Sequence, residues 1–204
     1  MSDNLKRYRA ICDGLKQFFP KQLTPRQWQH FRVMAAMING VVGSRHVHLP
    51  KLADKFPSQA DRESRIKRFA RWLQNADVTQ ASYFAPFAEA LLVGLAAHPL
   101  VLVIDGSTVG RGCQCLMVSV VYRNRALPVG WLVFKGSKGH SSQARHLDLL
   151  RQVQPLIPAG ATVVLLGDGE FDGIEVLEQL EMWGWGYVCR TAKNTILYDN
   201  TFAN

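Results

Sequence analysis

Two aspartates that each follow an apolar run are the residues of this sequence best suited to catalysis. Asp105 ends the run LVLVID. Asp168 lies in LLGDGEFDG, where it follows the run 162–166 and Gly167. Two carboxylates at neighbouring strand ends repel each other unless a cation lies between them. Oxygen ligands beside small glycines favour Mg²⁺ or Mn²⁺ over zinc, and paired divalent ions promote phosphoryl displacement. The pattern predicts a two-metal site held by Asp105 and Asp168, although Asp-Gly is also a common turn.

The segments around these aspartates predict a mixed β-sheet flanked by helices. Apolar runs indicate strands, and helix-period runs indicate helices between the later strands; the expected strands are 100–104, 115–122, 129–135, 162–166 and 186–190, and the expected helices are 143–154 and 174–183. The connection RNRALP is short enough for an antiparallel hairpin. In such a sheet the fourth strand can lie beside the first, which would bring the two aspartates to neighbouring strand ends.

The positive charge of the chain lies in its first half. Residues 1–98 hold 15 Lys and Arg against 7 Asp and Glu, whereas residues 99–204 hold nine of each. The first half also reads as helical, with a helix expected at 27–39 after the Thr24-Pro25 cap and first turn. This asymmetry predicts a helical, basic DNA-binding domain at 1–98 and a separate core at 99–204. A merely soluble basic surface is the alternative.

A helix expected at 59–75 carries most of the DNA-binding prediction. Ser58 with Asp61 resembles a capping box, and the apolar positions expected to form the buried face are Ile66, Phe69, Ala70 and Leu73. Five basic residues lie within ten positions and are expected to contact DNA phosphates: Arg62, Arg65, Lys67, Arg68 and Arg71. A solvated helix face is the simpler interpretation of such a run.

The motifs of the second half resemble DDE transposases of bacterial insertion sequences, in the branch with a β-strand insertion before the catalytic glutamate. The resemblance rests on LVLVIDGSTVG, the hairpin CLMVSVVYRNRALPVGWLVFKGSKGHSS, LLGDGEFDG and YVCRTAKN, and covers about residues 100–197. It implies a ribonuclease H-like core, catalytic and metal-binding roles for Asp105 and Asp168, and a requirement for Mg²⁺ or Mn²⁺. It also implies element terminal inverted repeats and target DNA as partners, and a possible homodimer. The family's third acid, a glutamate in a tyrosine-arginine-glutamate-lysine motif, has no counterpart here, which predicts a C-terminally truncated protein.

Three functions stay open on the sequence alone. The first is metal-dependent DNA strand cleavage and strand transfer, and the second is DNA binding by an inactive truncated transposase that acts as a regulator or partner. The third is an unrelated metal-dependent nuclease or phosphatase. The sequence shows no signal peptide or membrane span, and its four cysteines form no CxxC pair, so a cytoplasmic, nucleoid-associated protein with reduced thiols is expected. His140 and His146 are weighed equally as surface, phosphate-facing or catalytic residues.

Overall fold

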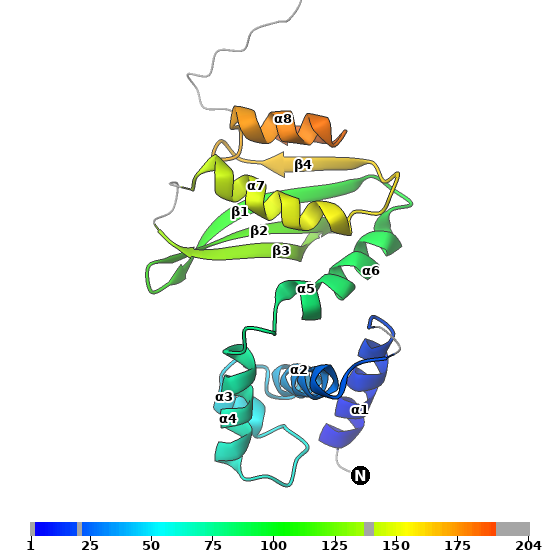
Figure 1. Ribbon diagram of the computed structural model, residues 1–204, viewed down its shortest axis with the longest axis vertical. Helices are drawn as coiled ribbons and strands as arrows, with labels where there is room; N and C mark the ends of the chain where they lie inside the picture. The colour runs from blue at the N-terminus through cyan, green and yellow to red at the C-terminus, as the bar shows by residue number, and fades with distance from the viewer. Residues whose placement is uncertain (1–2, 20–21, 137–140, 191–204) are drawn as a thin grey trace, which may run out of the picture. The chain divides into compact units, whose positions relative to one another are not determined.

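A computed structural model describes residues 3–19, 22–136 and 141–190 of the chain. The chain divides into two compact units, residues 1–87 and 88–204. Each unit is built around its own elements, the first helical and the second around a β-sheet (Figure 1). Among the helices in these ranges, none has the length and apolar character needed to cross a bilayer.

The N-terminal unit is built from short helices around one longer helix. The elements are α1 (Asp3–Lys16), α2 (Pro25–Ser44), α3 (Leu49–Ala53), α4 (Arg62–Leu73) and α5 (Gln80–Tyr83), and α6 (Ala85–Leu95) runs across the division between the units. Thr24 caps α2 as the sequence predicts. Its hydroxyl accepts a hydrogen bond from the Gln27 N–H, while the Gln27 side chain accepts one from the Thr24 N–H. This capping box fixes the start of α2.

Helix α2 continues past Gly40, so the predicted end of this helix at residue 39 is wrong. A Cβ atom at Gly40 would lie 2.8 Å from the Cβ of Leu52, closer than two carbon atoms can approach. The glycine therefore serves close packing between α2 and α3 instead of ending the helix. The helix ends at Ser44, followed by Arg45 in the left-handed conformation with φ 56°.

Helix α4 begins three residues later than expected because Asp61, not Ser58, is its N-cap. The Asp61 Oδ1 accepts a hydrogen bond of 2.8 Å from the Ser64 N–H. Phe69 is fully buried and packs in a core cluster with residues of α2 and α3, namely Val33, Ala36, Leu52 and Ala53. Leu73, predicted to lie on the same buried face, is 55% exposed. The buried face is therefore narrower than the apolar periodicity predicts.

The C-terminal unit is a five-stranded mixed sheet flanked by helices, in the strand order β3-β2-β1-β4-β5. Its strands are β1 (Leu100–Gly110), β2 (Cys113–Tyr122), β3 (Arg125–Lys135), β4 (Val163–Gly167) and β5 (Gly186–Cys189). Helices α7 (Gln143–Val153) and α8 (Ile174–Met182) join the later strands, with α7 against β2 and β3 and α8 against β5. Strands β1, β2 and β3 are antiparallel, whereas β4 and β5 run parallel to β1.

The hairpin between β2 and β3 is tighter than predicted. Tyr122 pairs with Arg125, so only Arg123 and Asn124 form the turn, and Arg123 has φ 50°. Two-residue turns with positive φ match the twist of the flanking strands. Much of the segment RNRALP, expected as a connection, therefore belongs to β3.

Candidate active site

The parallel pairing of β1 with β4 directs the two candidate aspartates to the same end of the sheet. Val103 pairs with Leu166, and two further steps of this register lead to Asp105 and Asp168. The predicted adjacency of the first and fourth strands is confirmed. Asp105 lies within β1, opposite Met117 of β2, and not at a strand tip, because β1 continues past the end of β4.

Each aspartate is exposed and uses one oxygen in a local backbone hydrogen bond. The Asp105 Oδ1 accepts a bond of 2.8 Å from the Gly106 N–H. The Asp168 Oδ1 accepts a bond of 3.0 Å from the Glu170 N–H, in the turn that follows β4. These bonds orient the carboxylates and leave the second oxygen of each available to a ligand. Two exposed carboxylates of this kind fit a hard divalent cation.

Glu170 places a third carboxylate beside β1. Its Oε1 accepts a bond of 3.4 Å from the Ser141 N–H. Its Oε2 lies 3.9 Å from the point where a Cβ at Gly106 would stand, next to Asp105. Within the described ranges, however, no three His, Cys, Asp or Glu side chains are grouped closely enough to hold a metal ion. The candidate metal ligands are therefore the pair Asp105 and Asp168, with Glu170 close by.

His146 of α7 is buried next to this turn, so of the alternatives weighed for it the surface role is wrong. The side chain is 1% exposed, its ring centroid lies 4.7 Å from that of Phe171, and neither ring nitrogen has a hydrogen-bond partner in the described part of the chain. His146 lies four residues before Leu150, and residues with this spacing share one face of a helix. The spacing therefore indicates that His146 lies on the inward side of α7. His140 lies outside the described residues.

The pH dependence of stability is expected to reflect His146. Burial lowers the pKa of its imidazole, and the negative charge of Asp168 opposes this effect only in part. Because the unfolded chain binds the proton more tightly, with a pKa of about 6.5, stability is expected to fall as the pH drops below about 6.5. The slope contributed by one histidine is at most about 1.4 kcal/mol per pH unit. Urea denaturation between pH 7 and pH 5, compared with His146→Leu, measures this contribution; an equal loss in both proteins would contradict it.

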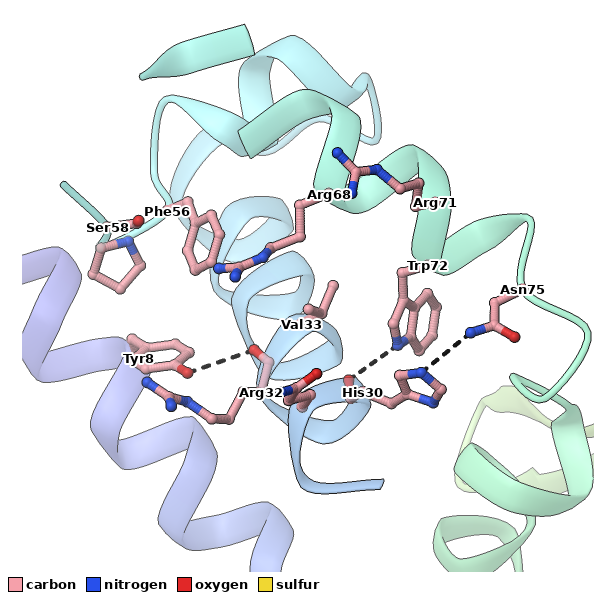
Figure 2. A pocket seen from close by; sticks show the side chains of 12 residues that line it. Tyr8, His30, Arg32, Val33, Phe56, Ser58, Arg68, Arg71, Trp72 and Asn75 are labelled. Carbon is pink, nitrogen blue, oxygen red and sulfur yellow. Dashed lines mark hydrogen bonds between the residues drawn. The ribbon is translucent and has the colours of Figure 1, made fainter. Parts of the chain in front are cut away.

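The five basic residues predicted to contact DNA all lie on α4, but their contacts differ. Arg62 forms an ion pair of 2.7 Å with Asp54, Lys67 one of 3.7 Å with Glu63, and Arg65 donates to the carbonyl oxygen of Phe56 at 3.2 Å. Arg68 and Arg71 instead line a groove (Figure 2). All five residues lie on one helix, as the sequence predicts. Three of them contact protein groups, and the other two line the groove.

A known protein family matches the second half of the chain. The sequence profile of the family described as "Transposase DDE domain" matches residues 97–203, just over half of the 204-residue chain. The chain belongs to this DDE transposase family. The matched region contains the five-stranded sheet and both candidate aspartates. A search of curated proteins gave no match.

Several solved structures are similar to parts of the chain, and among them are three transposase structures. The catalytic domain of Mos1 mariner transposase has 15% identity and a TM-score of 0.32, over 54% of this chain and 60% of that chain. A piggyBac transposase synaptic complex with hairpin DNA has 10% identity and a TM-score of 0.41, over 94% and 48%. The Mos1 strand transfer complex has 12% identity and a TM-score of 0.30, over 86% and 62%. The chain thus spans between 48% and 62% of the length of these proteins.

Proposed function

We propose that the chain performs metal-dependent DNA strand cleavage and strand transfer at the ends of a bacterial insertion sequence, with a ribonuclease H-like core. The observation that carries the proposal is the β1–β4 register, which directs two exposed aspartates to the same end of the sheet within the region matched by the transposase family. Asp105 and Asp168 hold Mg²⁺ or Mn²⁺ in this proposal. Divalent ions bound there would supply the positive charge that stabilises the attacking and leaving oxygens of phosphoryl displacement.

The protein residues have separate tasks in this proposal. The Gly106 and Glu170 N–H groups orient the two carboxylates, which avoids a reorganisation cost when the cation binds. The N-terminal unit holds the DNA through those basic residues of α4 that are not paired with protein carboxylates. Element ends and target DNA are the proposed partners, a homodimer is the proposed assembly, and the bacterial nucleoid is the proposed place of action.

The test is a strand-cleavage assay with the full chain on supercoiled DNA that carries the element ends. Nicking is expected with Mg²⁺ or Mn²⁺ and is expected to stop when EDTA removes the metal. The freed 3′-hydroxyl is expected to join target DNA, which gives a branched product on a denaturing gel. Nicking at the same rate in EDTA, or no cleavage with either metal, would overturn the proposal.

A further inference from the structure

A groove of about 450 Å³ opens on the N-terminal unit between α2, α4 and the loop before α4 (Figure 2). Arg32 of α2 and both Arg68 and Arg71 of α4 line it. Tyr8 of α1 and Phe56 of the loop contribute aromatic side chains to the same lining. The groove therefore joins segments that lie far apart in the sequence within this one unit.

The charge of the groove is not neutralised. Its lining contains three arginines and no aspartate or glutamate. Among the residues that the structure describes, none of the three guanidinium groups forms an ion pair, and all three residues are exposed. Arg68 lies over the ring of Phe56, with its guanidinium carbon 5.9 Å from the ring centroid. Three guanidinium groups without an ion-pair partner around one concave surface favour an anion, because guanidinium pairs in a bidentate manner with phosphate oxygens.

The other basic residues of α4 are already occupied by protein groups. Arg62 and Lys67 are paired with Asp54 and Glu63, and Arg65 supports the loop through the Phe56 carbonyl. A ligand that contacted Arg62 or Lys67 would have to compete with these carboxylates. The charge available to a ligand thus lies on the groove side of the helix.

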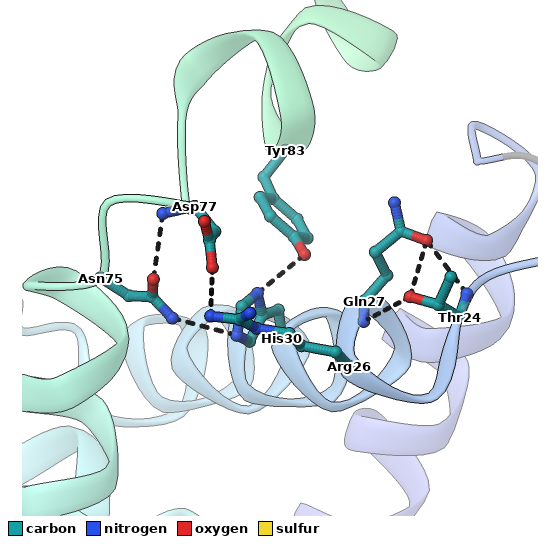
Figure 3. A network of polar contacts seen from close by, with 7 residues as sticks. All are labelled: Thr24, Arg26, Gln27, His30, Asn75, Asp77 and Tyr83. Carbon is teal, nitrogen blue, oxygen red and sulfur yellow. Dashed lines mark hydrogen bonds and ion pairs between the residues drawn. The ribbon is translucent and has the colours of Figure 1, made fainter.

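The wall of the groove is held in place by a polar network around His30 (Figure 3). The indole N–H of Trp72 donates to the His30 carbonyl oxygen at 3.0 Å. The ring of His30 contacts the Asn75 amide at 3.1 Å and the Tyr83 hydroxyl at 3.0 Å. These bonds connect α2 to α4 and to the segment that follows α4. The arginines therefore project from a preformed frame, which lowers the entropy lost on binding.

We propose that this arginine groove, formed by Arg32, Arg68 and Arg71, binds the phosphodiester backbone of duplex DNA. The inference rests on the proposed function, which supplies DNA as the partner, and it assigns the contact to one side of α4. Helix α4 then positions the duplex through its phosphates, and Arg62 and Lys67 stabilise the protein itself. Binding of this kind is sequence-independent and falls with salt, because each neutralised phosphate releases counterions.

Two double variants that remove the same charge from the same helix test the proposal. Arg68→Gln with Arg71→Gln removes the groove pair, and Arg62→Gln with Lys67→Gln removes the ion-paired residues. Fluorescence anisotropy with a labelled duplex of mixed sequence gives affinity as a function of salt. The groove pair is expected to reduce the slope of log affinity against log salt by about 2, and affinity at ~0.1 M salt by about 10- to 100-fold. The control pair is expected to change both values much less.

The possible results distinguish a failure of the groove proposal from a failure of the proposed function. Equal losses in the two double variants, or a larger loss in the control pair, would overturn the groove while DNA binding and cleavage stand. No DNA binding by the unmodified chain would overturn both proposals. If the groove pair does not fold, as judged by circular dichroism, Arg32→Gln on α2 carries the test. It is expected to reduce the salt slope by about 1, and an unchanged slope would reject the groove.

Discussion

Replacing Asp168 by asparagine is expected to lower the rate of metal-dependent strand cleavage by more than about 100-fold. Loss of a group that merely supports a metal ligand already costs about 10- to 100-fold, and this change removes the charge of a proposed ligand itself. The asparagine Oδ1 can still accept the bond that the Glu170 N–H donates at 3.0 Å. The turn after β4 is therefore expected to keep its shape, so the loss reports on the metal and not on folding.

Asp148→Asn is the matched control for this experiment. Asp148 is an exposed residue of α7 and its replacement removes the same charge from the same unit. A second measurement is paramagnetic broadening by Mn²⁺ of the amide signals of Gly106 and Gly169, which adjoin the two aspartates in the sequence. Broadening is expected in the unmodified chain and in Asp148→Asn, and is expected to be lost in Asp168→Asn and in Asp105→Asn. Wild-type cleavage by Asp168→Asn would remove this residue from the proposed site.

Replacing Phe69 by alanine is expected to remove much of the stability of the N-terminal unit. Phe69 has no exposed surface, and its ring stacks on Phe56 with a centroid separation of 5.3 Å. Truncation of a buried phenylalanine costs about 3–5 kcal/mol, whereas a domain of this size has roughly 4–13 kcal/mol in total. Because Phe56 also lines the arginine groove, the same change is expected to weaken DNA binding.

Leu73→Ala on the same helix is the control for Phe69→Ala. Leu73 is 55% exposed, so its truncation is expected to alter stability by no more than about 0.5 kcal/mol. Hydrogen exchange of peptides from α2 and α4, followed by mass spectrometry, reports on this unit separately from the sheet. Similar protection in the two variants would show that Phe69 does not have the central packing role assigned to it.

Much of the sheet could be predicted from the sequence because its strands are continuous apolar runs between turn residues. The order of helices and strands after residue 100 and the adjacency of β1 and β4 are as predicted. The bounds of β1 and β3 are not, because pairing with β2 extends both strands through residues whose local preference is weak. Such pairing depends on a partner strand, and no local pattern contains it.

In the helical unit the local capping chemistry was visible at Thr24, while packing between helices was not. Gly40 looks like a helix end in sequence, but in the structure it serves the contact with Leu52. Leu73 fits the apolar period, yet its side chain is 55% exposed. For the site, the sequence places both aspartates at the ends of apolar runs. The ion pair of Arg62 with Asp54 joins α4 to a residue outside it and appears only in the structure, whereas the Lys67–Glu63 pair and the burial of His146 both follow helical i, i+4 spacing.

Because β1 continues past the end of β4, the backbones of the two aspartates are supported differently. Asp105 is held inside a strand that stays paired with β2 on both sides of it, so its backbone has little freedom to shift. Asp168 comes after the last residue of β4 and belongs to a turn. The Asp105 carboxylate is thus anchored in a paired strand, whereas the Asp168 carboxylate is held by a turn. Substitutions at residues 169–173 are therefore expected to change the spacing between the two carboxylates while the sheet that anchors Asp105 stays unchanged.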